Sequence, residues 1–515
     1  MAEFISATKV AGLIKDNSTI AVSGYIGAVV AEEIFTAIED RFKESQAPKA
    51  LTIIHGAGIG DGDSKGMNHF AHEGLVKRII GAHWGLAPKL QPLVAENKIE
   101  AYSLPEGPIV HLFRETAAKR PRLITHIGLG TFADPDHGGG KLNEITTEDI
   151  VEKIEIDGKK YLSYKTFKLD YAILRGTFAD ELGNITLDEE ALTLNVTAIA
   201  MAVKNNNGKV IVQVKSKVKA NSLPPKSVKI PGVLVDYVVV VADDKNHMQT
   251  FGTKYNHNLL LPNSMVQEQL SKLPLDERKI VAKRAAKLIS STDKVMNYGI
   301  GLPEYVAMVL KEQSQGSKSI SDLTSTIDAG VFGGIPLVGL DFGTAIGAQA
   351  VLDEPYMFDF YSGGGIDIAF LGMAQCDFMG NVNASKFGPK IAGYGGFIDI
   401  AQNAKTLVYC STFTAGKLKV QAKEGKLAIV QEGLNKKFLK EIEQITFSGI
   451  SAIAIQQKVY FVTERAVFKL EPEGLTLIEI APRVDLQRDV LDLMEFKPII
   501  AKSLKDMDAD IFIDL

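Results

Sequence analysis

The sequence predicts an α/β protein made of two homologous open lobes with mainly parallel sheets. The chain has 515 residues, which is more than one ordinary hydrophobic core usually holds. Apolar runs typical of strands alternate with helical patterns, and such alternation favours parallel α/β units. The third observation is an internal repeat, which indicates two copies of one plan.

The repeat has two parts. The stretch "STIAVSGYIGAVVAEEI" from Ser18 resembles "DKVMNYGIGLPEYVAMV" from Asp293, and each reads as a strand, a glycine turn and a helix. Further along, "DELGNIT" from Asp180 resembles "DFMGNVN" from Asp377. The first two stretches start 275 residues apart (293 − 18), whereas the second two start 197 residues apart (377 − 180). The first copy therefore has more residues between its two landmarks than the second copy, so we expect an insertion in the first copy.

The individual elements follow from local patterns. The start "MAEFISATKVAGLIKDNST" predicts a short amphipathic helix and lacks the apolar core of a signal peptide. The runs "ALTIIHG", "YAILRGT" and "GKVIVQV" predict strands, and "EALTLNVTAIAMAVKN" predicts a helix. The longest apolar run, "VLVDYVVVVA", is far shorter than the roughly 20 residues of a membrane helix, so it predicts a buried strand.

A connector between the lobes is predicted in "HMQTFGTKYNHNLLLPNSMVQEQLSKLP", where turn residues cluster and periodicity is lost. The helical pattern "LDERKIVAKRAAKLI" follows, with Asp276 as the expected N-cap. We therefore place the first lobe, with its insertion and connector, at residues 1–274 and the second at 275–515.

Composition and charge exclude several classes of protein. Hydrophobic residues make up 46% and charged residues 23% of the chain, as in ordinary globular proteins. A net charge of −5 provides no basic field for nucleic acid. Cys376 and Cys410 stand among apolar residues, which is typical of buried thiols in a reducing compartment. We expect a cytoplasmic protein that binds neither nucleic acid nor membranes.

Glycine-rich turns mark a candidate binding surface. The turn in "NYGIGLPEYV" precedes a helix expected to start at Pro303, and it can present backbone N–H groups to an anion or be a plain βα connection. Further glycine sets occur in "YSGGGIDIAFLG", "GNVNASKFGPKIAGYGGFIDI" and "CSTFTAGKLKV". Lysines within or beside them are either solvated surface or, as a group, partners for the phosphates of a nucleotide-bearing molecule.

Two other kinds of site are disfavoured. His69, His72, Glu73 and His83 lie in "HFAHEGLVKRIIGAHW", but the spacing is no zincin motif and no companion ligands accompany them, so we expect no metal. The chain also lacks the G-x-S-x-G elbow of serine hydrolases.

The ordered motifs "VSGYIG", "HLFRETAAKRP", "LRGTFADELGNIT", "NYGIGLPEYV", "GGIPLVGLDFG" and "GGGIDIAFLG" resemble the family I CoA-transferases, in particular the single-chain propionate or acetate CoA-transferase type. The resemblance runs through essentially the whole chain and implies the family's NagB/RpiA-like fold. It also implies ping-pong exchange, in which a glutamate carboxylate attacks an acyl-CoA thioester and then carries CoA as a thioester. Coenzyme A is thus a substrate, and no permanently bound cofactor is expected.

The family pattern T-x-E-x-G-x-x-G-G-x-P falls on Thr326 to Pro336 and places Asp328 at the position of the nucleophile, one methylene short of glutamate. Close relatives carry a glutamine where this chain has Glu106, and its amide helps to form the oxyanion hole with a backbone N–H near Gly364. An ionised Glu106 would repel an oxyanion, whereas a protonated one would donate a hydrogen bond.

The resemblance assigns further contacts. The turn formed by Gly299, Ile300, Gly301 and Leu302 resembles the family's CoA-contacting turn. Gly395, Gly396 and Lys417 are weaker candidates for contact with CoA. The family commonly forms dimers or tetramers, so we expect a homo-oligomer.

Three functions remain compatible with the two differences from the family pattern, Asp328 in place of glutamate and Glu106 in place of glutamine. The first is a CoA-transferase acting on a short-chain acyl-CoA and a carboxylate such as acetate, with Asp328 as nucleophile. The second is an acyl-CoA hydrolase in which a carboxylate activates water. The third is a CoA-thioester-binding protein without catalytic activity, and the fold alone does not choose among them.

Overall fold

The computed structural model describes residues 2–265, 273–314 and 323–514. The chain forms two compact units, each assembled from three stretches of sequence. Unit 1 consists of Met1–Val266, Ile327–Asp359 and Pro389–Asp399, and unit 2 consists of Gln267–Thr326, Phe360–Gly388 and Ile400–Leu515. The predicted boundary after residue 274 separates the two copies of the internal repeat along the sequence, which is a different division from that into compact units. It stays a prediction.

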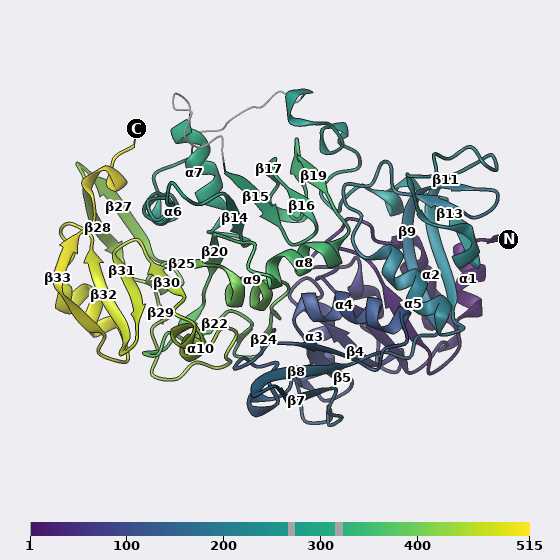
Figure 1. Ribbon diagram of the computed structural model, residues 1–515, viewed down its shortest axis with the longest axis horizontal. Helices are drawn as coiled ribbons and strands as arrows, with labels where there is room; N and C mark the ends of the chain where they lie inside the picture. The colour runs from purple at the N-terminus through teal and green to yellow at the C-terminus, as the bar shows by residue number, and fades with distance from the viewer. Residues whose placement is uncertain (1, 266–272, 315–322, 515) are drawn as a thin grey trace. The chain divides into compact units, whose positions relative to one another are not determined.

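Unit 1 is built on a sheet whose main path is entirely parallel. The strands in spatial order are β1 (Glu3–Phe4), β13 (Tyr237–Val240), β11 (Lys209–Val218), β9 (Tyr171–Asp180), β2 (Thr19–Val22), β3 (Leu51–His55), β4 (Val76–Gly81) and β5 (Glu100–Ser103). Figure 1 shows β9, β11 and β13 side by side. The short antiparallel strands β10 (Ile185–Thr186) and β12 (Val228–Ile230) extend the sheet. The prediction of a mainly parallel sheet is confirmed.

Helices cover both faces of this sheet. α1 (Ala7–Leu13) and α2 (Glu32–Ser45) pack in one hydrophobic cluster with side chains such as Ile20 and Ile53. α4 (Glu106–Ala117) and α5 (Val196–Asn205) pack in another with the next residues along the same strands, Ala21 and Ile54. Because successive strand residues face opposite sides, both faces are buried, which explains the continuous apolar runs of the sequence.

A small antiparallel sheet interrupts the parallel plan of unit 1. It consists of β6 (Arg122–Thr125), β8 (Lys159–Lys165) and β7 (Val151–Ile156), in that spatial order. This sheet lies between the two landmarks of the first repeat, where the sequence predicts extra residues.

Unit 2 has a mainly parallel sheet. β15 (Thr324–Ile327), β14 (Val295–Tyr298), β20 (Ile368–Gly372), β25 (Thr406–Cys410) and β30 (Lys458–Val462) pair in parallel. β31 (Ala466–Glu471) pairs antiparallel with β30 and with β32 (Gly474–Ile480), and β33 (Ile499–Asp506) pairs parallel with β32. Strands β31, β32 and β33 are yellow in Figure 1. Asp276 caps α6 (Glu277–Ala286) by accepting hydrogen bonds from the N–H groups of Arg278 and Lys279, as predicted. α7 (Glu304–Ser314) begins directly after Pro303.

The second landmark of the internal repeat is the same turn in both units. In unit 1 the Asp180 carboxylate accepts hydrogen bonds from Asn184 N at 2.9 Å and Asn184 Nδ2 at 3.0 Å. In unit 2 Asp377 accepts the corresponding bonds from Asn381 N at 3.0 Å and Asn381 Nδ2 at 2.8 Å. Gly183 and Gly380 have positive φ angles of 86° and 73°, a conformation that favours glycine. The repeat is therefore structural as well as sequential.

Two expectations about side chains and helices can be compared with the fold. Cys376 and Cys410 are free and buried, as predicted. Among the described residues, each helix is either too short or too polar to span a bilayer.

Candidate active site

Asp328 lies in unit 1, directly after β15, where the chain passes from unit 2 into unit 1. Its Oδ1 accepts a hydrogen bond from the backbone N–H of Ala329 at 3.1 Å. The residue as a whole is half-buried. This combination of a fixed carboxylate and partial exposure suits a nucleophile.

Tyr25 holds the same carboxylate oxygen from another part of unit 1. The Tyr25 hydroxyl donates to Asp328 Oδ1 at 2.6 Å, a short bond typical of an O–H donor and an ionised acceptor. Burial, and then the charges of Asp328 and Glu106, raise the pKa of Tyr25 well above its ordinary value. The hydroxyl therefore stays protonated and remains a donor.

Three more carboxyl groups surround Asp328 in unit 1. Glu106 opens α4, Glu354 opens α8 (Glu354–Ser362), and Asp399 lies in the first turn of α9 (Phe397–Asn403). Their relative exposures are 1%, 2% and 0%, so all three are removed from water. Asp399 Oδ2 accepts a hydrogen bond from Gly107 N at 3.3 Å, and Glu106 lies within hydrogen-bonding reach of Glu354.

Burial keeps this group of carboxyls protonated to unusually high pH. Burial is the largest cause for Glu106, whose pKa rises well above its usual range, followed by the charges of Asp328 and Glu354. Burial also raises the pKa of Glu354 to about 8 and that of Asp399 to about 7. The pKa of Asp328 is raised by burial too, but the hydrogen bonds from Tyr25 and Ala329 N oppose the rise. Asp328 is thus the member whose ionised form is best stabilised.

The segment around Gly395 and Gly396 forms one wall of the site. Gly395 N donates to Ala82 O at 3.0 Å, and Gly395 O accepts from Glu106 N at 3.2 Å, which ties the segment to the end of β4 and the start of α4. A Cβ on Gly396 would lie 2.6 Å from Asp328 Oδ2, and one on Gly395 would lie 3.3 Å from Glu106 Oε2. Two consecutive glycines therefore let the backbone approach both carboxyls.

The other predicted site residues belong to unit 2. Gly299 N donates to Phe370 O at 2.8 Å, while Ile300 is 55% exposed, and Gly301, with a φ of 88°, has no atom within 4 Å of a built Cβ. The turn up to Leu302 is thus open along one side. Lys417 is exposed and adopts a positive φ of 66°. Their contact with CoA stays a prediction.

Gly364 also lies in unit 2, in the turn after α8. Its N–H donates to Tyr361 O at 2.9 Å within that turn. Donation to an oxyanion requires this bond to be shared or exchanged, so the predicted role of Gly364 stays a prediction.

Comparison with known proteins decides the family. The sequence profile of the family described as "Coenzyme A transferase" matches residues 4–241. The chain is 48% identical to caffeate CoA-transferase of Acetobacterium woodii, covering 99% of this chain and 98% of that protein. It is 43% identical to acetate CoA-transferase YdiF of Escherichia coli K12, covering 99% and 95%.

The chain belongs to the coenzyme A transferase family. Solved structures of the Escherichia coli O157:H7 acyl-CoA transferase YdiF agree with this assignment. The apoenzyme superposes with a TM-score of 0.92 and the thioester complex with CoA with a TM-score of 0.91, each at 42% identity over 100% of this chain and 96% of the other. The predicted fold and the transferase class are confirmed.

Two histidines of this CoA-transferase, His69 and His72, are engaged by carboxylates. His69 contacts Glu32 through Nε2 at 2.8 Å and Glu39 through Nδ1 at 2.5 Å, and His72 Nε2 contacts Glu39 at 2.7 Å. These carboxylates raise the pKa of His69 against the opposing effect of burial. In the described part of the chain, no group of three or more His, Cys, Asp and Glu residues is arranged to hold a metal ion.

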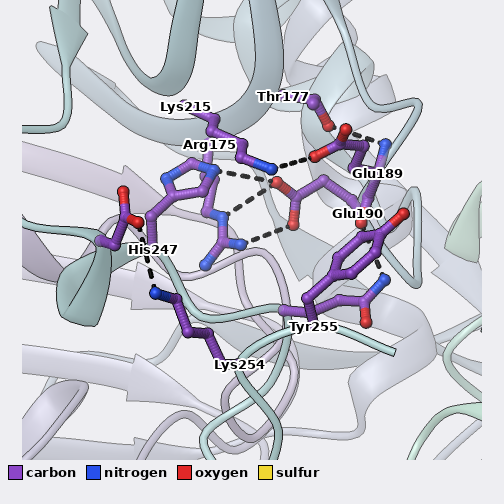
Figure 2. Close-up of a pocket in the computed structure, with 10 residues that line it drawn as sticks. Arg175, Thr177, Glu189, Glu190, Lys215, His247, Lys254 and Tyr255 are labelled. Carbon is purple, nitrogen blue, oxygen red and sulfur yellow. Dashed lines mark hydrogen bonds and ion pairs between the residues drawn. The ribbon is translucent and has the colours of Figure 1, made fainter. Parts of the chain in front are cut away.

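A separate polar pocket in unit 1 is lined by residues that form ion pairs with one another (Figure 2). Arg175 contacts Glu190 through Nε at 3.1 Å and Nη2 at 2.9 Å, and His247 Nε2 lies 3.3 Å from Glu190. Lys215 and Lys254 at the rim pair with Glu189 and Asp244 respectively. Since these charges already neutralise each other, we interpret the pocket as a structural network that anchors β9.

Sequence reasoning missed three residues of this candidate site. Tyr25 stands in the quoted motif "VSGYIG", and its position directly after Gly24 at the end of a strand is the one available clue. Asp399 is an isolated acid inside the apolar run "FIDI", and Glu354 precedes a proline at a helix start, where an acid is ordinarily a capping residue. Only the folded chain brings these groups to Asp328.

Proposed function

We propose that this CoA-transferase moves CoA between a short-chain acyl-CoA and a carboxylate such as acetate, with Asp328 as the nucleophile. The observation that carries the proposal is the setting of the Asp328 carboxylate. Tyr25 and Ala329 N hold Oδ1, while Oδ2 faces the side-chain-free surface of Gly396. The carboxylate is therefore held in a defined orientation.

The proposed reaction has two covalent steps in each direction. Asp328 Oδ2 attacks the thioester carbonyl carbon, the C–S bond breaks, and CoA leaves as a thiolate to give an aspartyl mixed anhydride. The thiolate then attacks Cγ of Asp328, and the acyl group leaves as a carboxylate, so that Asp328 carries CoA as a thioester. An acceptor carboxylate reverses both steps and takes the CoA.

We propose that Glu106, as a neutral carboxylic acid, stabilises the oxyanion by donating a hydrogen bond to it. The charge that develops on the thioester oxygen requires a hydrogen-bond donor, and a carboxylic acid is one. The raised pKa of Glu106, caused first by burial, supports the neutral form. The same observation argues against an acyl-CoA hydrolase in which an ionised Glu106 is the base for water.

The substrates are inferred from relatives and from the residues after the acid. One relative is named an acetate CoA-transferase and another a caffeate CoA-transferase. The small residues of "AGVFGGIP" after Asp328 favour a short acyl chain such as acetyl or propionyl. We further propose that the glycine turn from Gly299 to Leu302, with Lys417, contacts CoA, that Gly364 serves the oxyanion, and that the enzyme acts in the cytoplasm as a homo-oligomer in short-chain acyl-CoA metabolism.

The test is acyl exchange with purified protein. Acetyl-CoA, propionyl-CoA, butyryl-CoA and caffeoyl-CoA are each incubated with and without a second carboxylate, and free CoA and new acyl-CoA are measured. The proposal predicts new acyl-CoA only when an acceptor is present, with the short-chain donors fastest. Free CoA released without acceptor would indicate a hydrolase, turnover of caffeoyl-CoA alone would contradict the short-chain assignment, and no reaction would indicate a binding protein.

A further inference from the structure

Glu106 and Glu354 form a pair of buried carboxyls without an obvious source of hydrogen bonds. In the described part of the chain, neither Glu106 Oε1 nor Glu354 Oε1 accepts a hydrogen bond from a donor. A buried carboxyl oxygen without a donor is costly. A proton between the two carboxyls satisfies both oxygens at once.

The charges around the pair also disfavour ionisation. The groups that act most strongly on Glu106 are the carboxyls of Asp328, Glu354 and Asp399, and Glu354 faces Glu106 and Asp328. Tyr25 adds a hydroxyl whose own pKa is raised by burial and then by these carboxyls, and His111 lowers the pKa of Asp399. The N-termini of α4 and α8 favour a negative charge only weakly, so we expect no more than one of the pair to ionise readily.

The two oxygens of Glu106 have different surroundings. Oε2 faces Gly395, directly beside Gly396, which faces Asp328 Oδ2. The Asp328 carboxylate and Glu106 Oε2 therefore contact adjacent residues of the same backbone segment, Gly396 and Gly395. Glu106 Oε1 is therefore the oxygen available for a hydrogen bond with the Glu354 carboxyl.

We propose that Glu354 is a positioning residue that, as a neutral acid, donates a hydrogen bond to Glu106 Oε1 and so leaves the Glu106 proton on Oε2, where it serves the reacting centre. This inference rests on the proposed function, because it matters for catalysis only if a charge develops beside Asp328. When Glu354 loses its proton, Glu106 turns its own O–H toward the Glu354 carboxylate. The hydrogen bond to the oxyanion is then lost, although Glu106 remains neutral.

The pH dependence of transfer is the kinetic test. In wild type, kcat/KM falls as pH rises through the pKa of Glu354, which burial raises to about 8. Glu354→Gln supplies a permanent amide donor of the same shape, so we expect near-wild-type activity at neutral pH and an alkaline fall shifted upward by at least about one pH unit. Glu354→Ala removes the donor and is expected to lower kcat/KM roughly fivefold or more at neutral pH. Asp353→Asn, which removes a neighbouring carboxylate paired with Lys229 at 3.1 Å, is the control expected to keep the wild-type profile.

Infrared spectroscopy tests the proton itself, independently of activity. The difference spectrum between wild type and Glu354→Gln, recorded over roughly pH 6 to pH 10, is expected to show a carboxylic acid C=O band that disappears on the alkaline side. Absence of this band at neutral pH, or identical pH profiles of kcat/KM in wild type and Glu354→Gln, would overturn the inference. If no variant transfers CoA but the band titrates as expected, the proton arrangement stands and the proposed function alone fails.

Discussion

The substitution Asp399→Asn provides a quantitative test of the buried carboxyl group. Asp399 is fully buried, and burial raises its pKa from an ordinary 3.8 to about 7. A group with a raised native pKa contributes stability that is fully present below the unfolded pKa and is lost as pH rises through the native pKa. Asparagine has the shape of the neutral acid and does not titrate, so the variant escapes this loss.

The magnitude follows from proton linkage. Between about pH 4.5 and pH 6.5 the unfolded chain has released the Asp399 proton and the native protein has kept it, which costs wild type ~1.4 kcal/mol per pH unit. Over this range the free energy of unfolding of Asp399→Asn should therefore rise relative to wild type by about 3 kcal/mol.

Trp84 supplies a specific assay for this change. It is the only tryptophan of the chain and is buried in unit 1, so urea unfolding followed by tryptophan fluorescence reports the unit that contains Asp399. Asp236→Asn is the matched control. Against the opposing effect of burial, hydrogen bonds from Val210 N, Lys209 and Lys204 hold the pKa of Asp236 below its ordinary value, so its carboxylate stabilises the native state above that ordinary pKa, and the stability is lost as pH falls below it. The control is destabilised at neutral pH, with a difference from wild type that stays constant from about pH 4.5 to pH 6.5. A constant difference for Asp399→Asn as well would refute the reasoning.

Two further substitutions address the setting of Asp328. Tyr25→Phe removes the 2.6 Å hydrogen bond to Asp328 Oδ1. Since a bond to a charged group contributes ~1.5–3 kcal/mol, we expect a loss on the order of 10- to 100-fold in kcat/KM, and an unchanged steady-state rate would exclude a role for the hydroxyl. Gly396→Ala places a Cβ 2.6 Å from Asp328 Oδ2, which should displace the carboxylate and lower kcat by ~10²-fold while the urea midpoint stays close to wild type. A drop in kcat matched by a large loss of stability would indicate general damage instead.

Much of the fold could be predicted from the sequence, because strands and turns are specified by short runs of neighbouring residues. Consecutive apolar residues such as Ile20 and Ala21, or Ile53 and Ile54, bury both faces of a parallel sheet, and the Asp-x-x-Gly-Asn turns repeat as the sequence suggests. The assembly of each unit from three stretches could not be predicted, since it depends on where the chain crosses between the units at Ile327, Phe360, Pro389 and Ile400.

The candidate site likewise contains some residues that could be predicted from the sequence and others that could not. Asp328, Glu106 and the Gly395–Gly396 pair could be selected from motifs, and they lie together in unit 1. Tyr25 and Asp399 could not, because the contact between Tyr25 and Asp328 joins residues 303 positions apart and that between Gly107 and Asp399 joins residues 292 apart. Nothing in the local sequence of either partner specifies such contacts.

Covalent attachment of CoA to Asp328 can be tested by trapping the intermediate. Wild type and Asp328→Asn are incubated with acetyl-CoA or propionyl-CoA, reduced with borohydride or quenched with hydroxylamine, and digested for peptide mass spectrometry. We expect the reduced or hydroxamate product on the peptide that contains Asp328 in wild type, and no such product in Asp328→Asn. A product that maps to Glu106 or to another residue, or one that persists in Asp328→Asn, would contradict it.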